Sequence, residues 1–423
     1  YYLVGAWTVT PGVRITIDPG VQVYANTTNS SIIVHGEIHS LGTSANPVFI
    51  GVNPSISWTY NSGYWAGIKG QNPAQGNDPL LMRNTTVAGP SNFWYTPGQS
   101  YTGYQNLFEF RYFFRTSANV VVDNTTFQNG NQILTEPDAY AYNLGSYVIE
   151  NLNFTNISRV HFDNGYRWYN TCYGEWWDDV SFYRSGVYLS NPNVMSMYSG
   201  SSYCSSSNRP VYDGWTFEQS DVQMNSQQTW TTTTASNPSW YRGTFIDTAV
   251  TLLSTSSFNA YLELRDSNFT ATGSPSATAW QYSQYASQRG TAFITAATGS
   301  YGKWTVANNS FAPTNGWTGI EYTYSVGHMK APYNWWGTNN VTTIDGLIED
   351  MLDNNGGGWV NYSPFWTSSA MNQLDWNGTS PANIPLDREL SGSLFFSKTM
   401  TLNNSPYYLV GAWTVTPGVR ITI

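Results

Sequence analysis

Charged side chains are scarce in this sequence. Only 10% of its 423 residues are Asp, Glu, Lys or Arg, against about 25% in ordinary globular chains. The chain contains 17 Lys and Arg residues and 26 Asp and Glu residues, which gives a net charge of −9. The basic residues form no cluster, and recognition of a phosphate backbone depends on such clusters. We therefore expect no nucleic-acid partner.

Long apolar runs are also missing. No stretch approaches the roughly 20 apolar residues that are needed to cross a bilayer. The sequence opens with Tyr1 and shows neither a basic segment nor an apolar signal segment there. We therefore expect no membrane span, and we interpret the chain as a mature product or an excised segment.

Cysteine is nearly absent. The sequence contains two, Cys172 and Cys204, both within a region rich in tyrosine and tryptophan. In an extracellular protein this pair predicts a disulfide that fixes a long excursion of the chain. Two free buried thiols are the alternative.

Aromatic residues, Ser, Thr, Asn and Gly are abundant instead. Tyr, Trp and Phe make up 16% of the chain, which is too much for a disordered protein and favours a rigid β structure with a neutral polar surface. Glycans attached to Asn-X-Ser/Thr sites would supply the solubility that charges usually give, although this composition also produces such sites by chance. An extracellular location with N-linked glycans follows as our expectation. Twelve sites fit the pattern: Asn26, Asn29, Asn84, Asn124, Asn153, Asn156, Asn268, Asn308, Asn340, Asn361, Asn377 and Asn403.

The two ends of the chain have the same sequence. The first seventeen residues, YYLVGAWTVTPGVRITI, return unchanged at Tyr407–Ile423, with an offset of 406 residues. This repetition predicts one full period of a tandem array followed by the first strands of the next copy. Assembly with identical copies is then expected to involve the terminal aromatic residues Tyr1, Tyr2, Trp7, Tyr407, Tyr408 and Trp413.

Short strands are predicted near the start. Apolar residues alternate with polar ones, and Pro-Gly, Asn-rich and Gly-Thr-Ser turns separate the segments. The expected strands are Val13–Ile17, Val21–Ala25, Ile32–Ser40 and Val48–Gly51.

A phenylalanine recurs along the middle of the chain. Eight of these residues follow short apolar-polar alternations at intervals of 18 to 35 residues: Phe127, Phe154, Phe182, Phe217, Phe245, Phe269, Phe293 and Phe311. A solenoid coil of three short strands and three turns needs roughly 20–30 residues. We therefore predict that these rings stack on one another inside a solenoid.

Two regions interrupt this recurrence, and a third is helical in pattern. Residues 166–212 and 227–241 are predicted as excursions from the solenoid. Ile344–Leu352 carries apolar residues at helical spacing and is followed by three glycines, which predicts a short helix.

Several sequence segments resemble those of a known fold family. These are ITIDPGVQV (15–23), IIVHGEIHSLGTSANPVFI (32–50) and WAGIKG (65–70), with APYNWWG (331–337) and VNYSPFWT (360–367) near the other end. Together they resemble the right-handed parallel β-helix (pectin-lyase-like) repeat domains of archaeal and bacterial cell-surface proteins. The resemblance implies an all-β solenoid with these parts: opening coils at 1–70, a body with excursions at 71–330, a closing module with the short helix at 331–367, a linker at 368–389, and the start of the next repeat at 390–423.

Pectin-lyase-like folds host lyases and hydrolases, so catalytic residues have to be sought one by one. The only adjacent aspartates are Asp178 and Asp179, and the nearest Gly-His pair is at His328. Glu175 could pair with either aspartate as an acid and base, but the basic motif of the hydrolases and the acidic cluster of the lyases are missing. We expect no enzyme activity, no catalytic residues and no cofactor.

Three residues near the start of the chain are the main candidates for metal ligands. His35, Glu37 and His39 would share the outer face of a single strand, and imidazole and carboxylate groups bind zinc or copper. Alternate residues on a strand lie about 7 Å apart, too far to share one ion readily. We favour a polar outer stripe or a contact with a neighbouring copy, and we expect His161 and His328 to be structural.

These features favour a non-catalytic structural unit of an extracellular, glycosylated surface filament or surface-layer-like fibre that assembles end to end. A glycan-binding adhesin is the main alternative, because exposed Tyr and Trp rings can stack on sugars. A polysaccharide lyase or hydrolase is less favoured.

Overall fold

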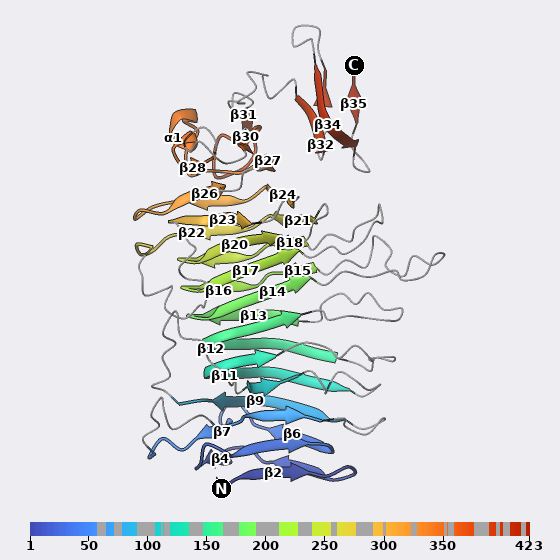
Figure 1. Cartoon of the computed structure of the whole chain (residues 1–423), viewed down its shortest axis with the longest axis vertical. Coiled ribbons are helices and arrows are strands. Elements are labelled where there is room, and N and C mark those ends of the chain that lie inside the picture. The colour runs from blue at the N-terminus through green and yellow to red at the C-terminus, as the bar shows by residue number, and fades with distance from the viewer. Residues whose placement is uncertain are drawn as a thin grey trace, which may run out of the picture.

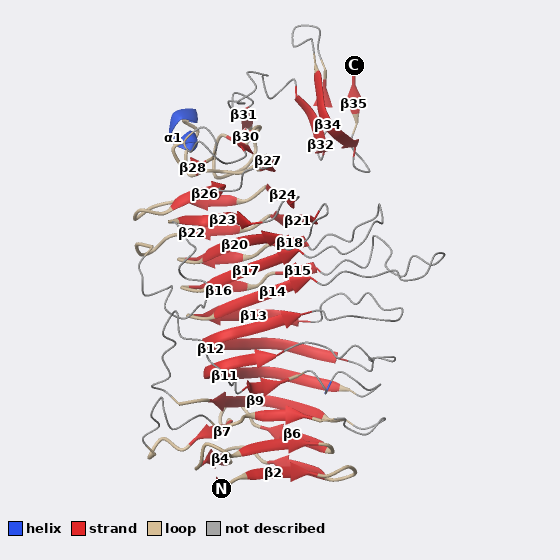
Figure 2. Cartoon of the chain, in the orientation of Figure 1, coloured by secondary structure: helices blue, strands red, loops and turns tan. Residues whose placement is uncertain are grey.

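The structure is a computed structural model, and it consists of short strands stacked in parallel along one long axis (Figure 1). Almost every regular element is a strand (Figure 2). It describes residues 1–56, 65–71, 78–90, 106–110, 113, 119–134, 147–163, 177–191, 211–226, 239–254, 260–275, 291–298, 302–322, 328–350, 353, 359–375, 389–394, 398–400, 407–415 and 420–423.

The strands form three stacks, which we call faces A, B and C in the order in which each coil visits them. Face A contains β3 (Arg14–Ile17), β6 (Glu37–Leu41), the starts of β9 (Leu80–Ala88), β11 (Val120–Leu134) and β12 (Tyr147–Asp163), and the first residues of β13 (Trp177–Tyr183). In the later coils the strand that precedes face B belongs to a separate parallel sheet of β15 (Val211–Asp213), β18 (Ser239–Tyr241), β21 (Ala260–Arg265), β24 (Gly302–Ala307), β27 (His328–Lys330) and β29 (Trp359–Asn361).

Face B follows after a sharp corner. It contains β1 (Tyr2–Leu3), β4 (Gln22–Ala25), β7 (Val48–Val52), the middle parts of β9, β11 and β12, most of β13, and then β16 (Thr216–Glu218), β19 (Thr244–Ile246), β22 (Asn268–Thr270) and β25 (Ser310–Ala312).

Face C completes the coil. It contains β2 (Ala6–Val9), β5 (Ser31–Val34), β8 (Ile68–Gly70), β10 (Asn106–Glu109), the ends of β11 and β12, β14 (Gly186–Asn191), β17 (Asp221–Ser226), β20 (Ala249–Ser254), β23 (Ala292–Thr298), β26 (Thr318–Tyr322) and β28 (Ile348–Glu349). All pairings on the three faces are parallel, so the chain is an all-β parallel solenoid.

Phenylalanine rings stack through the interior behind face B. Successive ring centroids lie 5.4, 5.1, 4.9, 5.0, 4.5 and 4.8 Å apart, and the last ring lies 4.8 Å from the indole of Trp336. We call this set the ring stack: Phe127, Phe154, Phe182, Phe217, Phe245, Phe269, Phe311 and Trp336. The structure confirms the predicted stacking for these phenylalanines.

The prediction that Phe293 belongs to the same stack is wrong. It lies on face C in β23, and its ring stacks on Trp317 with centroids 4.8 Å apart. The short phrase that precedes Phe293 alternates like the others, but its strand pairs with β20 and β26 and not with β22 or β25. The local pattern therefore identifies an inward-facing ring without identifying its face.

Residues with positive φ form the corners between the faces. The corner between faces A and B uses Gly20, Asn84, Asn124, Asn151, Gly214, Arg242, Asp266, Asn308 and Tyr333; the corner between faces B and C uses Asn129, Asn156, Arg184, Gln219 and Asp247. Left-handed backbone favours Gly, Asn and Asp over other residues. This preference explains why so many coils place Asn or Asp between two strands.

Buried polar side chains connect the corners of successive coils. At the corner before face B, Ser267 Oγ accepts the Gly243 N–H (3.0 Å), Asn309 Oδ1 accepts the Ser267 N–H (2.9 Å), and Asn334 Oδ1 accepts the Asn309 N–H (2.8 Å). Each of these backbone donors would otherwise be buried without a partner, which is costly. The corners are therefore held by hydrogen bonds that run from coil to coil.

The same arrangement occurs at the other corner. Ser185 Oγ accepts the Ile157 N–H, Ser220 Oγ accepts the Ser185 N–H, and Thr248 Oγ1 accepts the Ser220 N–H, each over 3.2 Å. The sequence did not predict these two series of corner hydrogen bonds, because isolated Ser, Thr and Asn residues resemble the abundant polar residues of the surface.

The expected strand Ile32–Ser40 is interrupted. Strand β5 ends at Val34, and β6 begins at Glu37. A Cβ added at Gly36 would lie 2.2 Å from the Val13 carbonyl oxygen, so only glycine fits this close approach. The chain turns there from face C to face A.

The predicted helix is shorter and earlier than expected. Helix α1 spans Val341–Asp345, and Asn340 caps it by accepting the Thr343 N–H over 3.0 Å. Ile348 is not helical; it pairs in β28 with Ile320. Ile344 reaches the core from helix α1, and Ile348, four residues later, reaches it from strand β28. Their spacing matches that of a helix, although only the first of them is helical.

Strands β13 and β14 lie within 166–212, where a single excursion was predicted. Strand β15 also begins within that range, at Val211, and β18 lies within 227–241. Residues 166–176, 192–210 and 227–238 lie outside the described residues. Cys172 and Cys204 do so as well, and with them the predicted disulfide. Among the described helices, none has the length and apolar character that a membrane crossing requires.

The chain ends in a smaller set of strands beyond the main stack. Antiparallel β30 (Phe365–Trp366) and β31 (Leu374–Asp375) follow the last coil. Parallel pairs then form between β32 (Glu389–Leu394) and β34 (Tyr408–Val415), and between β33 (Lys398–Thr399) and β35 (Ile421–Thr422). The two copies of the terminal repeat thus lie toward opposite ends of the molecule (Figure 1).

Candidate functional site

The first coil leaves one end of the solenoid open. Strands β1, β2 and β3 pair with β4, β5 and β6 of the next coil, and among the described strands they have no neighbour on the other edge. An unpaired edge presents free backbone N–H and C=O groups, which can pair with another strand. This edge is therefore a surface at which another strand can be added.

A groove of about 540 Å³ lies along this open end. Its lining is largely apolar and aromatic, and we call it the end groove: Tyr1, Tyr2, Leu3, Val4, Gly5, Ala6, Trp7, Ile15, Thr16, Ile17, Asp18, Val21 and Val23. Tyr2 is 65% exposed, Val4 76% and Trp7 39%. Exposed apolar residues gathered in one place are typical of interaction sites.

The second copy of the same sequence has a partner strand. In register, β34 places Tyr408 beside Glu389, Leu409 beside Leu390, and Trp413 beside Gly392. Strand β35 places Ile421 beside Lys398 and Thr422 beside Thr399. The sequence therefore occurs once paired with the strands that follow it in the chain, and once paired with the strands that precede it.

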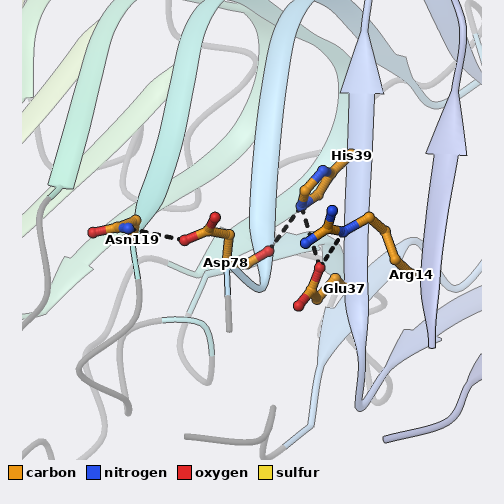
Figure 3. A network of polar contacts seen from close by, with 5 residues as sticks. All are labelled: Arg14, Glu37, His39, Asp78 and Asn119. Atoms are coloured by element: carbon orange, nitrogen blue, oxygen red, sulfur yellow. Dashed lines mark hydrogen bonds and ion pairs between the residues drawn. The ribbon is translucent and has the colours of Figure 1, made fainter. Parts of the chain in front are cut away.

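A polar network fastens the first coil to the coils that follow (Figure 3). Arg14 Nε donates to Glu37 Oε2, His39 Nε2 lies 3.0 Å from the Asp78 carbonyl oxygen, and Asn119 Nδ2 donates to Asp78 Oδ1 over 2.9 Å. The hydrogen bond to Glu37 raises the pKa of Arg14. The network joins four successive coils along face A, those of β3, β6, β9 and β11.

The network also corrects the expected outer stripe. Glu37 and His39 share the outward side of β6, but both are buried, at 7% and 8% exposure, because Arg14 and the Asp78 backbone cover them. His35 belongs to the bend before β6 and not to that strand. His39 Nε2 lies 3.6 Å from Glu37 Oε2, whose carboxylate is already paired with Arg14. In the part of the chain that the structure describes, no His, Cys, Asp and Glu residues gather as a metal site.

The residues considered for catalysis are not brought together by the described strands. Glu175 lies outside the described residues. Asp178 and Asp179 begin β13, where Asp178 is in register with Glu150, whereas His328 begins β27 in a different sheet. His161 lies on β12, in register with Tyr188.

Four of the sequon asparagines have a backbone role. Asn84, Asn124, Asn156 and Asn308 all have positive φ and occupy corners. Their side-chain amides donate to the Gly42 carbonyl oxygen, Asn84 Oδ1, Asn129 Oδ1 and Asp266 Oδ1 respectively. A glycan on such an asparagine would substitute one of the two hydrogens of the same Nδ2 and leave one N–H to donate.

The other described sequons differ in exposure. Asn29, Asn153, Asn268 and Asn340 are exposed. Asn26 and Asn361 are half-buried, while Asn377 and Asn403 lie outside the described residues.

The comparisons with known proteins found no matching family model, no matching curated protein and no matching solved structure. The functional argument therefore rests on the residues and geometry described above.

Proposed function

We propose that this chain is a structural repeat unit of an extracellular, glycosylated surface filament or surface-layer-like fibre. In this proposal the solenoid is a right-handed parallel β-helix of the kind found in pectin-lyase-like surface domains. Units follow one another with a period of 406 residues, and the role is non-catalytic.

One observation carries the proposal: the sequence Tyr1–Ile17 lines the open end of the solenoid and returns unchanged beyond its other end. An identical segment has identical preferred neighbours. If each unit begins and ends with this segment, every unit is related to the next by the same rotation and translation. Repetition of that operation generates an open filament. The low charge and the exposed sequons suit a glycosylated outer surface.

Denaturing mass measurement of native filaments tests this function. We expect a species far heavier than the 47.2 kDa of this chain, before and after reduction and deglycosylation, because successive units are covalently continuous. A band near the mass of one chain plus its glycans would contradict covalent continuity and leave strand exchange between chains. Absence of the protein from any filament would overturn the proposal itself.

A glycan-binding adhesin is the second candidate, and the exposed rings of Tyr1, Tyr2 and Trp7 favour it. Aromatic rings stack on sugar faces in many binding sites. Saturable binding of the chain to a defined sugar on a glycan array would support this function. A structural unit should bind none.

We further propose that the chain does not cleave polysaccharides. Incubation with pectin, alginate and other uronic polymers should release no new reducing ends or unsaturated products. Turnover that is lost in both Asp178→Asn and Glu175→Gln variants would contradict this proposal.

A further inference from the structure

We propose that the end groove is the docking site for strands β32 (Glu389–Leu394) and β33 (Lys398–Thr399) of a second copy of this chain. This inference rests on the proposed end-to-end assembly and names the segment that makes the joint. The two terminal repeats need not contact each other. The strands that would pair with Tyr1–Ile17 of one copy are those that precede Tyr407–Ile423 in the other copy.

The pairing within this chain supplies the template. Because the terminal repeats are identical over seventeen residues, the register of β34 and β35 can be transferred to the start of the chain. Glu389 of the second copy would then lie beside Tyr2, Leu390 beside Leu3, Gly392 beside Trp7, Leu394 beside Val9 and Lys398 beside Ile15. This set of neighbours follows from a 406-residue shift.

In this register, the strands of the second copy lie beside residues that line the end groove. Tyr2, Leu3, Trp7 and Ile15 are all part of the end groove. The register places Gly392, which has no side chain, beside the largest of these side chains, Trp7. The occupant would add a parallel strand to the free edges of β1 and β2, a recognised mode of peptide binding.

Both copies are irregular at the same place in the repeated sequence. Beside β32, the residues Tyr408–Val415 form β34, and the pairing of the two strands shifts register between Leu409 and Trp413. At the open end, the equivalent residues form two shorter strands, β1 and β2, separated at Val4-Gly5, where Gly5 has a φ of 107°.

Binding of a synthetic peptide tests the proposal directly. The probe is a fluorescently labelled peptide of residues 389–406, ELSGSLFFSKTMTLNNSP, added to the full 423-residue chain. We expect saturable one-to-one binding by fluorescence anisotropy. A scrambled peptide of the same composition should not bind.

The repeated sequence offers a matched pair of variants. Trp7→Asp and Trp413→Asp make the same change in the same local sequence, but only Trp7 lines the open groove. We expect Trp7→Asp to weaken peptide binding by about tenfold or more, because aromatic anchors dominate such interfaces, and Trp413→Asp to leave it within about twofold. Equal weakening by both variants, or by neither, would overturn the inference.

Hydrogen exchange gives a readout that does not depend on a variant. Bound peptide should slow exchange of backbone amides within Ala6–Val9 and not in face C strands of the central coils. Unchanged exchange in Ala6–Val9 at saturating peptide would overturn the docking site.

The outcomes separate this inference from the proposed function. Native filaments of covalently continuous units, together with a full chain that does not bind the peptide, would remove the docking site and leave the function standing. Peptide binding without any native filament would support the docking site and remove the proposed function. If a sugar binds and Trp7→Asp abolishes sugar binding but not peptide binding, the groove is a glycan site and the inference fails.

Discussion

Phe245 lies in the middle of the ring stack, fully buried, with ring centroids 5.0 Å from Phe217 and 4.5 Å from Phe269. Each ring packs against one ring above and one below, so removal of a ring leaves a cavity with two unfilled sides. Close-packed interiors relax only partly around such a cavity.

Phe245→Ala should therefore lower the free energy of unfolding by about 3–5 kcal/mol, the usual cost of removing a buried phenylalanine. Phe49→Ala is the matched control, since Phe49 is only half-buried and packs at the surface against Tyr24. Urea unfolding followed by circular dichroism measures both variants. A Phe245 loss no larger than the Phe49 loss would contradict the importance of the stack.

Tyr333 makes the folded state sensitive to alkali. Burial raises its pKa to about 12, although the charge of Arg265 opposes this rise. An unfolded tyrosine loses its proton near pH 10. Between about pH 10 and 12 the unfolded chain therefore releases a proton that the folded chain keeps, and stability falls as pH rises.

Tyr333→Phe should remove this contribution. The loss of unfolding free energy between pH 10 and pH 12 should be smaller in the variant by up to about 3 kcal/mol, with the difference between the two proteins constant from pH 7 to 9. Chemical denaturation at stepped pH measures it. Parallel decline of both proteins above pH 10 would show that Tyr333 ionises freely in the folded state.

At the scale of elements, the corners decide where each strand ends. Asn151 has a φ of 56°, is exposed, and donates through Nδ2 to Asp123 Oδ1 over 3.0 Å. It is also outside any sequon, so its substitution leaves potential glycosylation unchanged. This makes it a suitable position at which to test the backbone requirement by itself.

Asn151→Ala should lower the free energy of unfolding by about 1–2 kcal/mol more than Asn151→Gly does. Both variants lose the side-chain hydrogen bond, and only alanine meets the steric penalty of a left-handed backbone. Thermal or urea unfolding of the pair measures the difference. Equal stabilities would mean that the hydrogen bond, and not the backbone, explains the asparagine.

The elements also show how far the sequence could be read in advance. The period of inward phenylalanines predicted the solenoid, because each coil must bury one ring in the same place. The alternation could not separate Phe293 on face C from Phe269 on face B, since both rings point inward with similar neighbours in sequence. The bend at Gly36 was missed because it depends on the Val13 backbone, which packs against it from the preceding coil.

The same limit applies to the candidate sites. Outward positions for Glu37 and His39 followed from the period of a strand, but their burial depends on Arg14 and Asp78 from other coils. Asn124 and Asn308 match a glycosylation pattern, and a three-residue pattern carries no information about φ. The terminal repeat was evident from the sequence, whereas the register of β32 against β34 required the structure.

At the scale of the whole molecule, the strands of the main stack run roughly perpendicular to the long axis, whereas β32, β34 and β35 run nearly along it (Figure 1). On face C, parallel pairings connect β2 to β28 without a break along the axis. Neighbouring strands in a sheet are spaced about 4.8 Å apart. A filament that continues the solenoid end to end would keep this spacing along its own axis.

Fibre diffraction from aligned native filaments should therefore show a meridional reflection near 4.8 Å. Filaments of an unrelated structure, isolated from the same preparation, serve as the control for orientation. A reflection of this spacing on the equator would mean that the strands run along the filament, and the end-to-end arrangement would then be wrong.

The parallel stacking of coils has a mechanical consequence. A pull along the long axis loads the hydrogen bonds between one coil and the next, and the coils can separate one after another from a free end. The 27 residues that separate Phe127 from Phe154 would extend to roughly 90 Å of chain, while the folded coil contributes only about 5 Å of length. A fibre of such units would be stiff at low force, would lengthen stepwise at higher force without breaking a covalent bond, and would dissipate the work of the pull as each coil opens.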